Sequence, residues 1–168
     1  MALIVIIIYG TGSVYGYYRD GRTASGNTFV ADRCWTQTTR ADFTAGVQSN
    51  VDLAAVPGDV VLGTTGGHYR ASGTEASQVF DSGKAGTSYD LLAWYATLPA
   101  STGITFQVRA SNTSFAKGSG SPAWTSVGGT SPVATGLPKG RYFQWRATLT
   151  TSNNAVSPAL HSVDVWYN

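Results

Sequence analysis

Residues 104–110 read ITFQVRA, and residues 141–150 read RYFQWRATLT. In the first stretch, Ile104, Phe106 and Val108 alternate with polar residues, and the second stretch repeats this pattern. A period of two is typical of a β-strand that buries one face in a core. The side chains of the second stretch that this pattern turns inward are Phe143, Trp145, Ala147 and Leu149.

Short apolar runs separated by turn-forming residues continue on both sides of residues 104–150. Turn-forming residues such as Pro57-Gly58-Asp59 separate short apolar runs, and Val163, Val165 and Tyr167 alternate at the end of the chain. No helical period is evident after residue 40, and even residues 42–47 fit the strand-and-turn rhythm. Short strands at this spacing predict an all-β fold, a two-sheet β-sandwich of jelly-roll type over residues 42–168.

Composition agrees with this fold and excludes several classes of protein. The 168 residues are 42% hydrophobic but only 12% charged, with a single glutamate, which argues against a mostly helical protein. A net charge of +2, without a Lys/Arg cluster, argues against a nucleic-acid partner. The one cysteine, Cys34, excludes an intramolecular disulfide. Beside Trp35 we expect it to be a small buried hydrophobe, with a cross-link between subunits as the alternative.

The chain begins with a long apolar run. Residues 2–9 read ALIVIIIY, and the first charged residue is Arg19, so the run is short for a membrane-spanning helix. Burial of Leu3 to Ile8 is worth on the order of 10 kcal/mol, so this segment needs a membrane, a groove or a neighbouring subunit. The predicted assembly interface consists of Leu3, Ile4, Val5, Ile6, Ile7, Ile8 and Tyr9.

The form of this segment stays open. Its β-branched residues suit a strand added to another subunit's sheet, and the glycines that follow equally allow a helix in a central bundle. A signal segment that remains uncleaved is a further alternative. The predicted organisation is a hydrophobic assembly segment at 1–18, a polar linker at 19–41 and the sandwich at 42–168.

Two regions resemble known families. Residues 15–31, YGYYRDGRTASGNTFVA, follow the apolar run and resemble the start of camelysin-like biofilm-fibre proteins. Residues 77–167 carry the patterns VFDSG, FQVRAS and GRYFQWRATLTTS, and are similar to β-sandwich modules of large secreted and surface-layer proteins. The second resemblance implies an extracellular location and an adhesive, spacer or carbohydrate-associated role. The apolar start also resembles type IV pilin amino termini, but Val5 stands where bacterial pilins generally carry glutamate.

Candidate sites for chemistry are few. A glycosidase pair would have to join Glu75 to an aspartate, yet the aspartates stand in turn-like contexts. These aspartates are Asp42, Asp52, Asp59, Asp81, Asp90 and Asp164. Calcium binding by loop carboxylates such as Asp52 and Asp59 is an alternative, but these residues lack EF-hand spacing. We therefore predict no enzyme activity, no metal site and no cofactor.

Aromatic side chains favour glycan contact instead. Tyr142 and Trp166 fall on the register opposite to their inward neighbours, so we expect them to be exposed and able to stack on sugar rings. Asn112-Thr113-Ser114 matches the N-glycosylation pattern.

Taken together, the sequence predicts an extracellular, cell-surface filament subunit, pilus-like and adhesive or biofilm-forming. Its partners would be copies of itself and surface glycans, with the membrane met only during export. The alternative is a carbohydrate-binding or spacer β-sandwich module of an exported protein.

Overall fold

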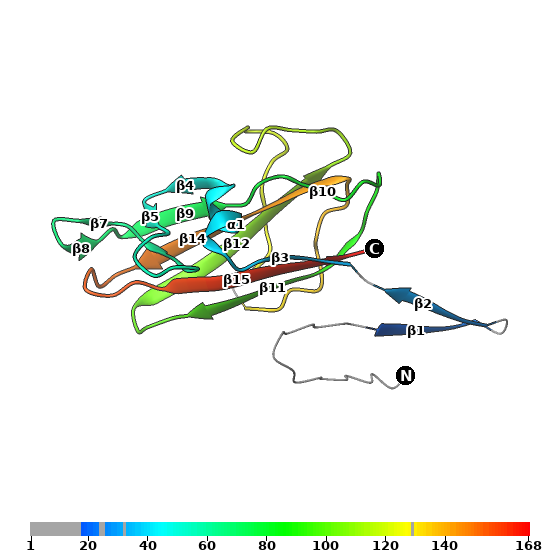
Figure 1. Cartoon of the computed structure of the whole chain (residues 1–168), viewed down its shortest axis with the longest axis horizontal. Helices are drawn as coiled ribbons and strands as arrows, with labels where there is room; N and C mark the ends of the chain where they lie inside the picture. The colour runs from blue at the N-terminus through cyan, green and yellow to red at the C-terminus, as the bar shows by residue number, and fades with distance from the viewer. Residues whose placement is uncertain (1–17, 24–25, 32, 129) are drawn as a thin grey trace.

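The fold is a two-sheet β-sandwich, as the alternating pattern predicts (Figure 1). The computed structural model describes residues 18–23, 26–31, 33–128 and 130–168. The predicted assembly interface, residues 3–9, therefore lies outside the described residues. The elements are β1 (Tyr18–Thr23), β2 (Gly26–Ala31), β3 (Arg33–Gln37), α1 (Arg40–Thr44), β4 (Val47–Ser49), β5 (Val51–Asp52), β6 (Val60–Leu62), β7 (Thr64–Thr65), β8 (His68–Tyr69), β9 (Ser72–Ala76), β10 (Phe80–Asp81), β11 (Tyr89–Thr97), β12 (Thr102–Ser111), β13 (Thr125–Ser126), β14 (Tyr142–Thr151) and β15 (Ala159–Tyr167).

Two antiparallel sheets form the layers of the sandwich. The six-stranded sheet has the order β13-β12-β14-β9-β4, and β10 also pairs with β14. The five-stranded sheet has the order β11-β15-β6-β5, and β3 also pairs with β15. Two hairpins, β1–β2 and β7–β8, form separate two-stranded sheets. The longest pairings, β12 with β14 and β11 with β15, join strands that are adjacent in space but not consecutive in sequence.

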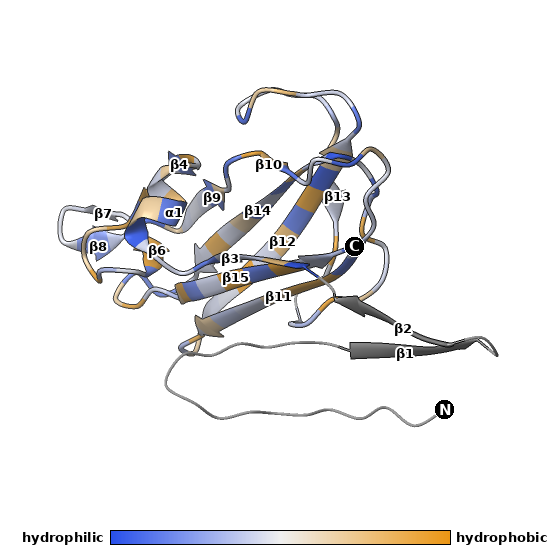
Figure 2. Cartoon of the chain, turned by 45° about the vertical axis from the view of Figure 1, so that its right-hand side comes forward, coloured by the Kyte–Doolittle hydropathy of each residue, from blue (hydrophilic) through white to orange (hydrophobic). Residues whose placement is uncertain are grey.

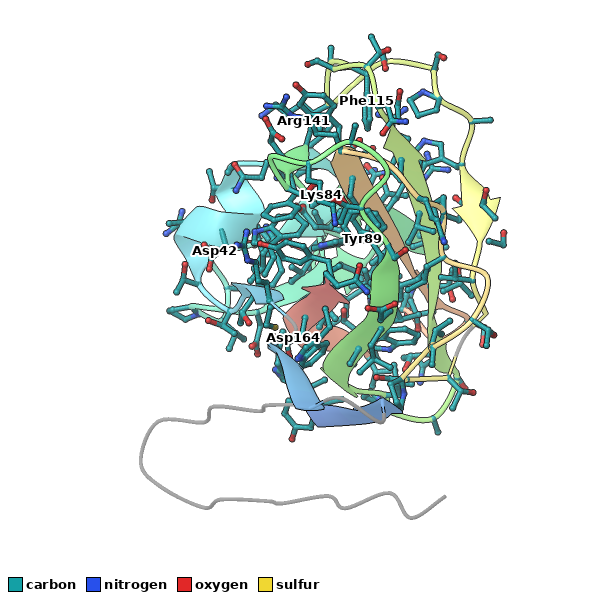
Figure 3. All side chains as sticks on the ribbon, turned by 90° about the vertical axis from the view of Figure 1, so that its right-hand side faces the viewer. Asp42, Lys84, Tyr89, Phe115, Arg141 and Asp164 are labelled. Atoms are coloured by element: carbon teal, nitrogen blue, oxygen red, sulfur yellow. The ribbon has the colours of Figure 1, made fainter. Side chains whose placement is uncertain are left out.

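The core lies between the sheets, where the alternation places it. Phe143, Trp145, Ala147 and Leu149 are each 0% exposed, which confirms the predicted inward face of β14. Figure 2 shows the alternation as bands of hydrophobic and hydrophilic colour along β12 and β14. Figure 3 shows the side chains that fill the space between the layers, including Tyr89, whose hydroxyl donates to the carbonyl of Gly140 at 3.1 Å.

One short helix replaces what the sequence led us to expect as strand and turn. Residues 40–44 form α1, because Thr39 and Asp42 make a reciprocal capping box. The Thr39 hydroxyl accepts from the Asp42 backbone N–H at 3.2 Å, and Asp42 Oδ2 accepts from the Thr39 N–H at 2.9 Å. A helix of one turn leaves too few residues for a period of 3.6 to be visible, so only the cap could have predicted it.

The five-stranded sheet includes residues from the segment that we predict to be a polar linker. Strand β3 lies within residues 19–41 and pairs with β15 from Tyr167↔Arg33 to Val163↔Gln37. Trp35 turns inward and stacks on Phe80, with ring centroids 4.8 Å apart. Gln37, 1% exposed, accepts from the Trp145 indole N–H at 2.7 Å and so ties β3 to the opposite sheet.

Among the described residues, the helical content is too short and too polar to include a membrane-spanning helix.

Candidate functional site

The two aromatic residues predicted to contact glycans lie in different surroundings. Trp166 is only 6% exposed, so the expectation that it is exposed is wrong. The reason is that β15 is a central strand, and its neighbours β11 and β3 place Leu91 and Cys34 on either side of Trp166. Tyr142 is half-buried, and the Arg141 guanidinium lies 5.3 Å from the centre of its ring.

Asn112 is exposed in the loop after β12. Its side-chain oxygen accepts from the backbone N–H groups of Gly86, at 2.8 Å, and Arg141, at 3.2 Å. The amide nitrogen to which a glycan would attach takes no part in these two bonds. Glycosylation at Asn112 stays a prediction.

The carboxylates considered for a hydrolytic pair are engaged separately. Glu75 is 0% exposed within the sandwich, Asp42 caps α1, and Asp52 accepts from the Ala54 backbone N–H at 2.6 Å. Asp81 forms a bidentate pair with Arg141, at 2.8 and 3.0 Å. In the described parts of the chain, these residues do not gather with histidine or cysteine into a group of three or more that could hold a metal ion.

Cys34 is exposed, so the expectation that it is a buried hydrophobe is wrong. It lies on β3, where Trp35 and Gln37 take the inward positions and Cys34 and Thr36 the outward ones. The Cys34 sulfur is 3.3 Å from the Thr36 hydroxyl.

A polar cluster that the sequence analysis missed forms where β11 ends beside the start of β15 (Figure 1). His161 Nδ1 lies 2.7 Å from Asp59 Oδ1, and His161 Nε2 lies 2.8 Å from the Thr97 hydroxyl. The Tyr95 ring lies 4.8 Å from the His161 ring, centroid to centroid. We call Asp59, Tyr95, Thr97 and His161 the His161 cluster.

Local structure positions each member of the His161 cluster. Pro57 and Gly58 occupy the middle of a β-turn, Gly58 with φ +94°, and the turn closes with the Asp59 N–H donating to the Val56 carbonyl at 3.0 Å. The turn thereby places the Asp59 carboxylate beside the His161 ring. The pairing of β11 with β15 shifts register between Tyr95↔Ser162 and Ala96↔Leu160, so His161 is the extra residue of a β-bulge. A bulge re-aims a side chain, here toward Asp59.

The hydrogen bonds of the His161 cluster have a direction. An ionised Asp59 can only accept, so Nδ1 of His161 carries the proton that lies between them. In the neutral imidazole Nε2 then accepts, and the Thr97 hydroxyl donates to it. This order of carboxylate, imidazole and hydroxyl is the arrangement of a Ser-His-Asp relay. Such an arrangement performs acyl transfer only together with N–H donors that face the developing oxyanion.

A second cluster is structural. The Arg109 guanidinium is 1% exposed and lies between the rings of Phe115 and Trp124, 4.7 and 4.3 Å from their centres. It donates to the Gln144 side chain at 2.6 Å and to the Ser119 carbonyl at 2.7 Å, among other carbonyls of the same loop. Arg109 therefore holds residues 112–124 against the outer face of the six-stranded sheet. Figure 3 shows Phe115 in this loop.

Comparison with known proteins identifies no match: neither a family model nor a curated protein matches this chain.

Proposed function

We propose that this protein is a subunit of an extracellular surface filament, which polymerises through its apolar amino-terminal segment. The β-sandwich would form the outside of the filament, and residues 3–9 would contact neighbouring subunits. An adhesive or biofilm role follows from a sparsely charged sandwich displayed on a cell surface.

The observation that carries the proposal is that the strands of both sheets lie between Arg33 and Tyr167. The sandwich and its core cluster thus complete themselves with residues that follow the apolar run. The apolar run precedes these strands in the sequence, and its exposure to water would cost on the order of 10 kcal/mol. Contact with other copies of the chain meets that need.

The edges of the five-stranded sheet support the same idea. At the β11 edge, Leu92 exchanges two backbone hydrogen bonds with Val133, at 2.8 and 2.9 Å, and the Trp94 N–H donates to the Ser131 hydroxyl. These contacts cover that edge. Strand β3, within the described part of the chain, pairs with β15 alone, so its other side offers backbone groups to an added strand. An apolar, β-branched segment of a neighbouring subunit is suited to that edge.

The hairpin β1–β2 adds a further argument. It pairs from Tyr18↔Ala31 to Thr23↔Gly26 as a sheet of its own. A two-stranded hairpin is marginally stable by itself in water. In a filament, packing between subunits would stabilise it.

Removal of residues 2–9 tests the proposal. We expect the full chain to sediment as large particles that negative-stain microscopy shows as fibres, and the shortened chain to sediment as a monomer. The unfolding transition of the shortened chain in urea serves as the control, because a folded sandwich must remain. A full chain that is already a monomer would overturn the proposal.

The alternative, a carbohydrate-binding module of an exported protein, is favoured by one observation, the exposed Tyr95 of the His161 cluster. Sugar binding and polymerisation are compatible, and the binding site is argued next.

A further inference from the structure

We propose that the His161 cluster is a binding site for a neutral pyranose sugar, with Tyr95 as the stacking platform. This inference does not depend on the proposed filament, because every residue that it uses belongs to the sandwich.

Tyr95 has the exposure that a platform requires. Tyr95 is 67% exposed, the highest value among the large hydrophobic residues within 33–128 and 130–168. It stands on the outer side of β11, since Trp94 before it pairs with the inward Val163. The His161 ring lies against it at an interplanar angle of 35°, which leaves most of the Tyr95 ring in solvent. A rigid aromatic ring on a strand can stack on the C–H face of a sugar at little entropic cost.

The polar groups around Tyr95 are those that recognise sugar hydroxyls. Thr97 is exposed, and its hydroxyl oxygen lies 2.8 Å from His161 Nε2. Whichever group donates, the hydroxyl oxygen keeps a lone pair for a ligand O–H. Asp59 uses Oδ1 for His161, and Oδ2 makes no hydrogen bond in the part of the chain that the structure describes. The Asp59 side chain is 19% exposed, so a ligand hydroxyl can reach it. The network that connects the three side chains holds them in place before a ligand arrives.

The charge of the His161 cluster and the residues around it limit the class of sugar that the site can bind. The carboxylate of Asp59 disfavours an anionic sugar and favours a neutral one that offers two adjacent hydroxyls. Val56, 46% exposed, belongs to the turn that presents Asp59, and Leu98, 51% exposed, follows Thr97. Within residues 33–128 and 130–168, three of the four exposed large hydrophobic residues lie close to this site in sequence: Val56, Tyr95 and Leu98, but not Val47. Exposed apolar side chains next to hydroxyl and carboxylate groups suit a pyranose, which has both apolar C–H faces and polar hydroxyls.

The His161 cluster lies away from the amino-terminal end of the sandwich, so assembly through the amino-terminal segment would leave the cluster accessible. His161 precedes Tyr167 by six residues on β15, and Tyr167 pairs with Arg33 at the start of β3. Six residues of strand span about 20 Å. The His161 cluster thus lies about 20 Å from the point where the amino-terminal part of the chain joins the sandwich.

Equilibrium dialysis of the full chain against fluorescently labelled neutral tetrasaccharides of glucose, mannose and galactose tests the site. We expect at least one of them to bind, Tyr95→Phe to keep the affinity and Tyr95→Leu to lose about tenfold or more, the equivalent of about 1.4 kcal/mol. Thr97→Val should also weaken binding, because it removes the hydroxyl and keeps the shape. Tyr142→Ala is the matched control, an aromatic on the other sheet that should not change binding.

Three results would overturn the site: binding of none of the three sugars at about 10 mM, equal affinity of Tyr95→Leu and the unaltered chain, or a loss confined to Tyr142→Ala. Particle size is measured on the same variants. We expect Tyr95→Leu to leave it unchanged, so failure of the sugar site and failure of the filament proposal remain distinguishable.

Discussion

The carboxyl group of Glu75 is buried inside the sandwich, where its charged form is disfavoured. The residue is 0% exposed, and Gln48 Nε2 donates to its Oε1 at 3.2 Å. Its Oε2 has no hydrogen-bond partner among the described residues. Desolvation raises the pKa of Glu75 to about 8, against the smaller opposing effects of the Gln48 bond and the charge of Lys117.

This pKa predicts how stability depends on pH. The folded protein keeps a proton on Glu75 that the unfolded chain, with an ordinary pKa of about 4.3, releases. The stabilisation is complete below the unfolded pKa and is lost as pH rises through the folded pKa, so the free energy of unfolding should fall between about pH 4.5 and pH 8.

Glu75→Gln tests this dependence, because glutamine resembles the protonated acid in shape. We expect urea midpoints to fall from pH 5 to pH 8 for the unaltered chain and much less for Glu75→Gln. At pH 8 the variant should be more stable, by on the order of 2 kcal/mol. Parallel pH profiles of the two proteins would contradict a buried, protonated Glu75.

We expect replacement of the buried Arg109 side chain to lower the free energy of unfolding strongly. Arg109→Met leaves the Gln144 side chain and several loop carbonyls without their donor, and it removes the cation between Phe115 and Trp124. We expect a loss of about 3 kcal/mol in urea unfolding. Arg141→Met, which removes an exposed ion pair with Asp81, should change stability much less. Equal effects of the two substitutions would show that the Arg109 contacts contribute little.

At the scale of elements, helix α1 depends on its cap. Thr39→Ala removes the side chain that accepts from Asp42 and should cost about 1 kcal/mol. Thr38→Ala is the matched control, since Thr38 contributes its backbone N–H, not its hydroxyl, to Asp42. Urea midpoints of the two variants compare them directly. Equal midpoints for Thr39→Ala and the unaltered chain would mean that the cap does not stabilise α1.

The long strands could be predicted from the sequence, whereas two of the short elements, β3 and α1, could not. β12 and β14 run for ten residues each, long enough for a period of two to be unmistakable. β3 and α1 have five residues each, and β3 is polar outside Trp35. The turn Pro57-Gly58-Asp59 was predictable because proline and glycine define it, whereas its partner on the β15 bulge was not.

The same limit explains why the sequence analysis misjudged Trp166 and missed the His161 cluster. Trp166 alternates like an exposed residue, but its burial depends on strands β3 and β11, which are far from it in sequence. The His161 cluster joins residues 59, 95–97 and 161, and only strand register and a bulge bring them together. Pairing of distant strands is a property of the whole sheet, which a local pattern does not encode.

For the whole molecule, we propose that the sandwich folds independently and that the apolar segment packs against other copies of the chain. The two parts make different predictions. Substitutions of buried polar residues of the sandwich, such as Glu75 and Arg109, should change unfolding without abolishing assembly of the folded chain. Substitutions in residues 3–9 should change assembly without changing unfolding of the sandwich.

The most direct test of the central claim is sedimentation velocity of the chain that carries Ile6→Asp and Ile8→Asp, beside a control that carries Thr11→Asp and Ser13→Asp. Both variants add two negative charges, but only the first places them in the apolar run. We expect the first variant to sediment as a monomer, while the control and the unaltered chain sediment as large particles. If all three proteins show the same particle size, the apolar segment does not drive assembly.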